Sequence, residues 1–203
     1  DRVGLVIFSG EAFTQCPLTT DKNVLKNIIS QLRTGQLADG TAIGVGLADA
    51  VARVKESTAK SKVVILLSDG VSNVGEIAPL TAGEIAKTFG VRIYTVGVGT
   101  MGKAQTPVAI YPNGQVEFAY VDVEIDEAVM TKISDMTGGK YFRATDNKSL
   151  KQVYAEIDKL EKTAISERNF SNKAERFFFF ACVAAIAMLL EFLLKFTVFR
   201  ALP

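Results

Sequence analysis

Two oxygen-bearing side chains, Thr41 and Asp69, have types and positions that suit a shared chemical site. Asp69 follows an apolar run, residues 63–67, which is typical of a buried strand, and Thr41 precedes a stretch with helical spacing. Ligands of open α/β sheets bind beyond the carboxyl ends of the strands, so we expect the hydroxyl and the carboxylate to converge there. Such hard oxygen ligands suit Mg²⁺, Mn²⁺ or Ca²⁺. The alternative is that Asp69 only forms an Asp-Gly turn, which occurs in any fold.

Three further polar residues lie next to this pair in the sequence, namely Ser68, Ser72 and Asn73. We predict that they support the metal ligands through hydrogen bonds. Polar residues after a strand are also ordinary turn formers, so this second interpretation stays open.

The composition excludes several other kinds of site. Histidine is absent from the 203 residues, which removes Ser-His-Asp and Cys-His nucleophile pairs and His-based zinc sites. Cys16 and Cys182 are the two cysteines and cannot form a four-thiolate site. The net charge is +1 and the basic residues are scattered, so there is no electrostatic footprint for nucleic acid. A hard divalent ion is therefore the metal that this composition supports.

Strand-like and helix-like segments alternate along the chain, which predicts an α/β fold with a doubly wound, mostly parallel sheet. A hairpin with its turn at Pro112-Asn113-Gly114 interrupts this alternation, so we interpret the hairpin as an insertion. The expected segments are strands at 3–8, 12–18, 62–68, 91–98 and 140–143, helices at 21–34, 43–54, 81–89, 126–137 and 147–163, and an inserted hairpin at 108–120 with its turn at 112–114.

The last forty residues differ in composition from the rest. Residues 164–176 are polar and charged and are predicted to form a juxtamembrane linker. Residues 177–194 are almost wholly apolar and would measure about 27 Å as a helix, close to the thickness of a bilayer core. We therefore expect a transmembrane helix with an interfacial tail over 177–199, with Glu191 near the interface; a buried core helix is the alternative. The membrane side of the preceding domain stays open.

Several blocks of this sequence together resemble von Willebrand factor A domains, and more narrowly the BatA-type membrane proteins of bacterial aerotolerance operons. The A-domain blocks are Gly-Thr-Ala-Ile-Gly at 40–44, Ile-Leu-Leu-Ser-Asp-Gly at 65–70 and Ile-Tyr-Thr-Val-Gly-Val-Gly at 93–99. The narrower resemblance rests on residues 2–13, 137–146 and 154–162. It implies a Rossmann-like A domain over residues 1–163.

The resemblance also implies a metal-ion-dependent adhesion site (MIDAS), with Thr41 and Asp69 at two ligand positions. In that family an Asp-x-Ser-x-Ser motif on the first central strand completes the site. The strand would lie upstream of residues 3–8, so we expect an A domain truncated at its N-terminus and lacking its first central strand. Mg²⁺, Mn²⁺ or Ca²⁺ should then bind weakly or not at all to residues 1–203 alone.

The function that this resemblance implies is a membrane-anchored, non-enzymatic interaction module whose ion binds a carboxylate of a partner protein. It further implies assembly with other Bat proteins and a MoxR-type AAA+ ATPase at the bacterial inner membrane, in stress or oxygen tolerance. One alternative is a structural scaffold with a non-functional metal site. Another is a Mg²⁺-dependent phosphohydrolase using Asp69, but Val71 stands where a companion aspartate is needed and there is no GxxxxGK[ST] phosphate loop.

Overall fold

The chain forms two units in a computed structural model, residues Asp1–Glu161 and Lys162–Pro203. The structure describes residues 2–99, 102–111, 115–123, 125–171 and 177–197. Within these, side chains are described except at 102–110, 118–123, 164–171, 177–178 and 195–197.

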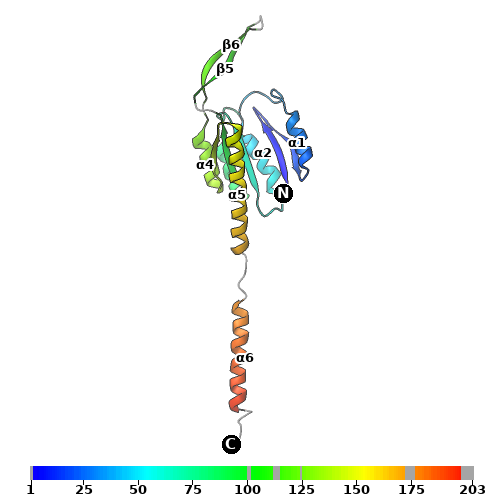
Figure 1. Ribbon diagram of the computed structural model, residues 1–203, viewed down its shortest axis with the longest axis vertical. Helices are drawn as coiled ribbons and strands as arrows, with labels where there is room; N and C mark the ends of the chain where they lie inside the picture. Colours follow the sequence, from blue (N-terminus) through cyan, green and yellow to red (C-terminus); the bar gives the residue numbers. More distant parts are fainter. Residues whose placement is uncertain (1, 100–101, 112–114, 124, 172–176, 198–203) are drawn as a thin grey trace. The chain divides into compact units, whose positions relative to one another are not determined.

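Three parallel strands form the centre of the first unit, in the order β3–β4–β7 (Figure 1). They are β3 (Val63–Ser68), β4 (Arg92–Val98) and β7 (Tyr141–Ala144), and all pairs are parallel. Helices α3 (Pro79–Thr88) and α4 (Glu127–Thr137) provide the crossovers between them. The prediction of an α/β fold with a parallel sheet is confirmed.

A separate two-stranded sheet lies at the start of the chain. Its strands, β1 (Val3–Phe8) and β2 (Ala12–Thr19), pair antiparallel with each other. No described strand joins β1 to β3, so the two sheets are not hydrogen-bonded to one another. Helix α1 (Lys22–Gln31) follows, and the carboxylate of Asp21 caps it by accepting hydrogen bonds from the Asn23 and Val24 amides.

Helix α2 (Ile43–Lys55) contacts both sheets and explains how they stay together. Ile43, Leu47 and Val51 are buried in a core that includes residues of β3, β4, α3 and α4. On β1, the ring of Phe8 packs on Gly46, where an added Cβ would lie only 2.8 Å from the ring. A single helix therefore bridges the separation between β1 and β3.

Helix α5 (Asn147–Ser171) covers the other face of the parallel sheet. Val153 and Ile157 are buried against Tyr94, Val96 and Phe142. The helix continues through Ser171 and does not end near Thr163, because the polar and charged sequence from 164 onward is compatible with a helix as well as with a linker. Residues 172–176 of the predicted linker lie outside the described residues.

The inserted hairpin is longer than the sequence predicted. It consists of β5 (Gly102–Ile110) and β6 (Val116–Val123), paired antiparallel as a sheet of their own. The predicted turn at 112–114 lies outside the described residues.

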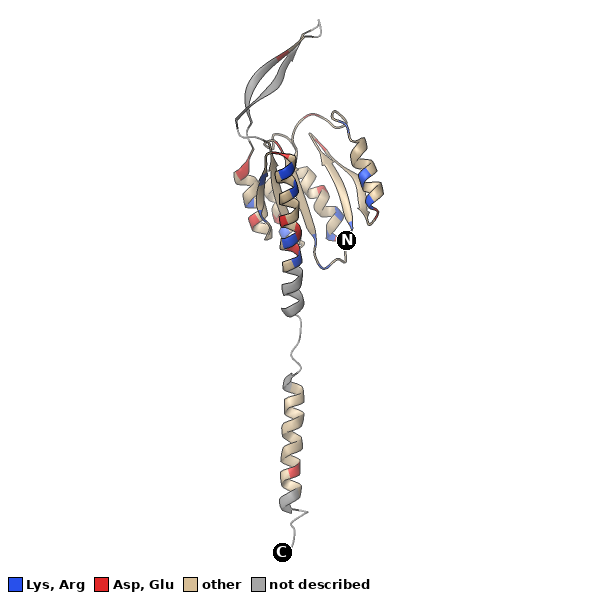
Figure 2. Ribbon diagram, in the orientation of Figure 1, with Lys and Arg blue, Asp and Glu red and all other residues tan. Residues whose placement is uncertain are grey.

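Helix α6 (Phe177–Thr197) forms the second unit together with the end of α5. Large apolar side chains between 179 and 194 are exposed, and Figure 2 shows the described part of α6 as almost free of charge. Over the described residues, no helix reaches the combination of length and hydropathy that a membrane span requires. The transmembrane helix predicted over 177–199 is therefore not confirmed.

Candidate functional site: an incomplete cation site

Thr41 lies at the start of α2 and is held there by the loop that follows β3. Its backbone amide donates to Asn73 Oδ1 at 2.8 Å, and the Asn73 amide donates to the Thr41 carbonyl at 3.1 Å. Ser72 Oγ donates to the same carbonyl at 3.2 Å. These three hydrogen bonds fix the Thr41 backbone, and the residue as a whole is half-buried.

Asp69 directly follows β3, and its turn lies beside the Thr41 side chain. A Cβ placed on Gly70 would lie 3.5 Å from Thr41 Oγ1, which is ordinary van der Waals contact. The Asp69 side chain is exposed, and its carboxylate has no hydrogen bond or ion pair with any described residue. The structure thus brings the Thr41 hydroxyl next to a turn whose carboxylate is unengaged.

The three supporting polar residues play two different parts. Ser72 and Asn73 bind the Thr41 backbone, as described above. Ser68 is buried and bonds within its own turn, with Oγ donating to the Gly70 carbonyl at 3.2 Å and accepting from the Gly70 amide at 3.4 Å. Ser72 and Asn73 therefore hold the backbone of Thr41 in place, whereas Ser68 stabilises the turn that follows β3.

The turn after β1 also shapes this site, and the sequence analysis missed it. The Ser9 carbonyl accepts from the Ala42 amide at 2.6 Å, and Ser9 Oγ donates to the Gly40 carbonyl at 3.0 Å. Gly40 has φ +129°, a conformation that side chains other than glycine rarely adopt. A Ser-Gly pair directly after a strand was the available signal, but the same pair is an ordinary turn signal.

A second close approach fixes α2 against the loop before α3. A Cβ on Gly44 would lie 1.9 Å from the Ile77 carbonyl oxygen, so only glycine fits there without a backbone shift. The first turn of α2 is thus clamped on two sides, by the β1 turn and by this loop. The position of Thr41 follows from that clamp.

The oxygen donors present fit a hard divalent ion, but they are too few to enclose one. Thr41 and Asp69 supply a hydroxyl and a carboxylate, which are ligands that Mg²⁺ and Mn²⁺ accept. No group of three or more acidic, His or Cys side chains is gathered at any point of the described chain. The β1–β2 sheet is not hydrogen-bonded to the β3–β4–β7 sheet, and the Ser9 turn that follows β1 contacts Gly40 and Ala42 on either side of Thr41. Thr41 and Asp69 are therefore the two oxygen ligands that the sequence predicted at this edge.

A polar cluster surrounds Glu161 of α5 at the other end of the parallel sheet, where strands β3 and β4 begin. Each of its side chains has a hydrogen-bond partner. The Glu161 carboxylate accepts from Arg92 Nη1 at 2.6 Å, Tyr94 Oη at 2.7 Å and Ser61 Oγ at 2.7 Å. Burial alone would raise the pKa of the Glu161 carboxyl, but the hydrogen bonds from Ser61, Tyr94 and Arg92 and the charge of Arg92 outweigh it and lower this pKa. This cluster fastens α5 to the amino ends of β3 and β4.

Comparison with known proteins identifies the class of this fold. The von Willebrand factor type A domain matches residues 1–156, and the chain belongs to this family. An uncharacterised protein of Borreliella burgdorferi is 27% identical over 161 residues, which cover 79% of this chain and 47% of the relative. A UPF0353 protein of Mycolicibacterium paratuberculosis is 32% identical over 174 residues, which cover 78% and 48%. The chain thus spans about half the length of these relatives.

Solved structures narrow the resemblance to Bat-type proteins. BatB from Bacteroides thetaiotaomicron is 26% identical with a TM-score of 0.65, covering 80% of each chain. Proximal thread matrix protein 1 from the mussel byssus, with a zinc-occupied MIDAS motif, is 25% identical with a TM-score of 0.58, covering 79% of this chain and 34% of that one. The resemblance to Bat-type A domains that the sequence motifs indicated is confirmed.

Proposed function

We propose that residues 1–163 form a non-enzymatic interaction module that binds a carboxylate of a partner protein through a divalent ion. The observation that carries the proposal is the Thr41 hydroxyl beside the turn of Asp69, whose exposed carboxylate has no partner among the described residues. A bound Mg²⁺ or Mn²⁺ would supply a Lewis acid with a coordination position for the partner's carboxylate. Thr41 and Asp69 would hold the ion, with Ser72 and Asn73 fixing Thr41.

The site is completed, in this proposal, by an Asp-x-Ser-x-Ser strand that lies between β1 and β3. Two observations support it. Helix α2 contacts both sheets, which have no hydrogen bonds to each other in the described chain, and Thr41 lies two residues before this helix. The similar mussel protein has a MIDAS motif that holds a metal ion. Residues 1–203 alone are then expected to bind Mg²⁺ weakly.

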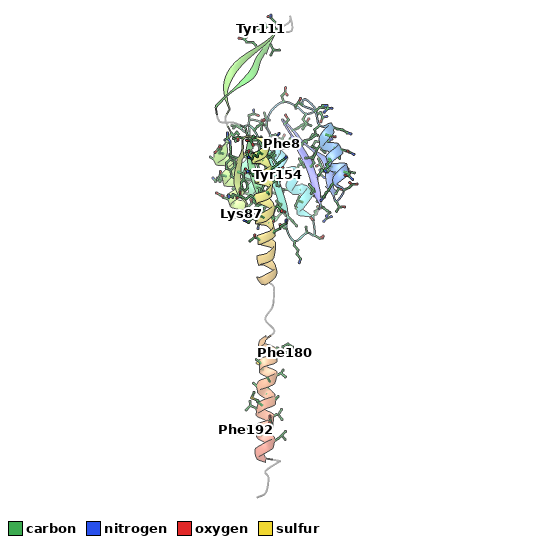
Figure 3. All side chains as sticks on the ribbon, in the orientation of Figure 1. Phe8, Lys87, Tyr111, Tyr154, Phe180 and Phe192 are labelled. Carbon is green, nitrogen blue, oxygen red and sulfur yellow. The ribbon has the colours of Figure 1, made fainter. Side chains whose placement is uncertain are left out.

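The proposal extends to location and partners. We infer that residues 177–199 anchor the domain at a bacterial inner membrane, supported by the exposed apolar side chains of α6, among them Phe180 and Phe192 (Figure 3). Similarity to BatB supports partners that include other Bat proteins and a MoxR-type AAA+ ATPase, in stress or oxygen tolerance.

The test is Mg²⁺-dependent capture of these partners by the protein extended upstream to include the proposed Asp-x-Ser-x-Ser strand. We expect D69A to abolish capture and D135A, an exposed aspartate on α4, to leave it unchanged. Addition of a chelator should abolish capture by the unsubstituted protein. Capture that survives both D69A and the chelator would show instead a scaffold whose metal site is not used.

The membrane anchor has a separate test. The chain should float with vesicles of phosphatidylethanolamine and phosphatidylglycerol, and a double substitution of Leu189 and Leu190 by Glu should abolish flotation. Equal flotation of both proteins would refute anchoring by α6.

A further inference from the structure

The loop that carries Thr41 is hydrogen-bonded to the turn after β1 on both sides of that residue. Ser9 Oγ donates to the Gly40 carbonyl at 3.0 Å, and the Ala42 amide donates to the Ser9 carbonyl at 2.6 Å. A single residue of the turn therefore holds both sequence neighbours of Thr41.

The turn and the loop are also in close contact through their backbones. The Gly10 amide donates to the Ala38 carbonyl at 2.7 Å, and a Cβ on Gly10 would lie 2.5 Å from the Asp39 carbonyl oxygen. A Cβ on Gly40 would lie 3.3 Å from Gly10 Cα and 2.6 Å from Val74 Cγ2, in the loop between β3 and α3. Because three segments meet this closely at Gly40, a displacement of the turn has to displace the loop of Thr41 as well.

The turn belongs to a sheet that is separate from the parallel sheet. Among the described strands, β1 and β2 pair with each other and with no third strand. The sheet contacts α2 through the ring of Phe8 (Figure 3), which packs on Gly46, and through the Thr14 hydroxyl, which donates to Asp49 Oδ2 at 2.7 Å. A sheet that is held to the core by side chains is expected to open at a lower free energy than the strands of the core.

We propose that the β1–β2 sheet regulates the metal affinity of the cation site, with Ser9 as the positioning residue that couples the two. This inference rests on the proposed function, because it concerns the affinity of the same site. With the turn in place, the loop holds Thr41 beside the Asp69 turn; with the turn displaced, Thr41 moves away from it. The apparent affinity for the ion is then the intrinsic affinity multiplied by the fraction of molecules in which the turn is in place.

This coupling has to act in both directions. An ion that binds more tightly when the turn is in place also stabilises the turn, by the same factor. Mn²⁺ at the site should therefore slow amide hydrogen exchange in β1 and β2, although neither strand contains a proposed ligand. A partner that displaces the β1–β2 sheet should, conversely, weaken metal binding.

Calorimetry of Mn²⁺ binding tests the role of Ser9 in the protein extended upstream to include the proposed Asp-x-Ser-x-Ser strand. S9A removes the donor to the Gly40 carbonyl and should weaken Mn²⁺ binding about fivefold, as expected for one lost hydrogen bond. S9T keeps a hydroxyl and should restore the affinity. S57A is the matched control, because Ser57 follows the far end of α2 and its hydroxyl accepts from Arg2. It should leave Mn²⁺ affinity unchanged.

Amide hydrogen exchange with and without Mn²⁺ separates this coupling from a general loss of stability. Mn²⁺ should slow exchange in β1 and β2 about fivefold in the unsubstituted extended protein, by reciprocity with the effect of S9A, and leave it nearly unchanged in S9A.

Three results would overturn the inference while leaving the cation site intact. They are equal Mn²⁺ affinity of S9A and the unsubstituted protein, equal weakening by S9A and S57A, and Mn²⁺ binding that does not change exchange in β1 and β2. If the unsubstituted extended protein binds no Mn²⁺, the proposed function fails and the inference fails with it.

Discussion

The two ends of the parallel sheet differ in whether their carboxylate is hydrogen-bonded. At the amino end, Glu161 accepts three hydrogen bonds and lies partly buried with Arg92 and Tyr94. At the carboxyl end, the exposed carboxylate of Asp69 has no partner among the described residues. A satisfied polar cluster contributes to stability, whereas an unengaged, exposed carboxylate is available to a ligand. We therefore expect substitutions at the first end to change folding and those at the second to change binding.

The largest expected effect is that of E161A on stability. Removing the carboxylate leaves Arg92 and the Tyr94 hydroxyl without their acceptor, and Tyr94 is only 2% exposed. We expect a loss of about 3 kcal/mol in the free energy of unfolding, measured by urea denaturation.

The matched control for this prediction is E156A on the same helix. Glu156 pairs with Lys140 at the surface, where both side chains are about half exposed, so its removal should cost less than about 0.5 kcal/mol. Equal losses for the two variants would refute the role of the Glu161 cluster.

The contribution of Glu161 should also be visible in the pH dependence of the free energy of unfolding. Because the pKa of Glu161 is lowered in the folded state, its contribution is present above the ordinary value of 4.5 and is lost as the pH falls through the lowered value. We expect the free energy of unfolding to decrease with acid below about pH 4.5, less steeply for E161Q.

Other carboxyl groups with a lowered pKa also make the protein less stable in acid. The contribution of Glu161 is therefore measured as the difference between the stability curves of the unsubstituted chain and of E161Q. The pKa of Asp146 is also lowered, chiefly by the hydrogen bond from the Ser149 amide. Subtracting the E161Q curve from that of the unsubstituted chain removes this shared contribution. Parallel curves below pH 4.5 would show that Glu161 does not contribute through its charge.

Asn73 should give an effect of intermediate size. Asn73→Ala removes the acceptor of the Thr41 amide. We expect a loss of about 1 kcal/mol in the free energy of unfolding, together with weaker Mn²⁺ binding by the extended protein. Unchanged Mn²⁺ affinity would show that Asn73 does not position Thr41 for a metal ion.

The smallest effect on stability is expected for D69A. Its carboxylate is exposed and unengaged, so its removal should change the free energy of unfolding by less than about 0.5 kcal/mol. Urea denaturation of D69A and E161A side by side measures the contrast between the two ends of the sheet. A loss for D69A as large as that for E161A would contradict it.

The sequence predicted the parts of this structure that depend on local patterns. The apolar run of β3 and the Asp-Gly turn located Asp69, and the alternation of strands and helices placed Thr41 at the same edge. The close approach of Gly44 in α2 to the Ile77 carbonyl was not predictable, because the two residues are more than thirty positions apart in the sequence.

The Glu161 cluster was missed for a related reason. Its donors Ser61, Arg92 and Tyr94 lie 100, 69 and 67 residues from Glu161 in the sequence, so no spacing reveals them. Charges on α5 looked like an ordinary solvated helix face. The same polar composition led to a predicted linker from residue 164, where the structure continues the helix to Ser171.

The most direct test of the central claim is a Mn²⁺ titration by calorimetry of the protein extended upstream to include the proposed Asp-x-Ser-x-Ser strand, compared with its D69A variant. The account predicts one Mn²⁺ per chain for the extended protein, and at least tenfold weaker binding for D69A, with both proteins equally stable. Equal Mn²⁺ affinity of the two proteins, or no binding by either, would contradict the claim that the Asp69 edge of the sheet is a cation site.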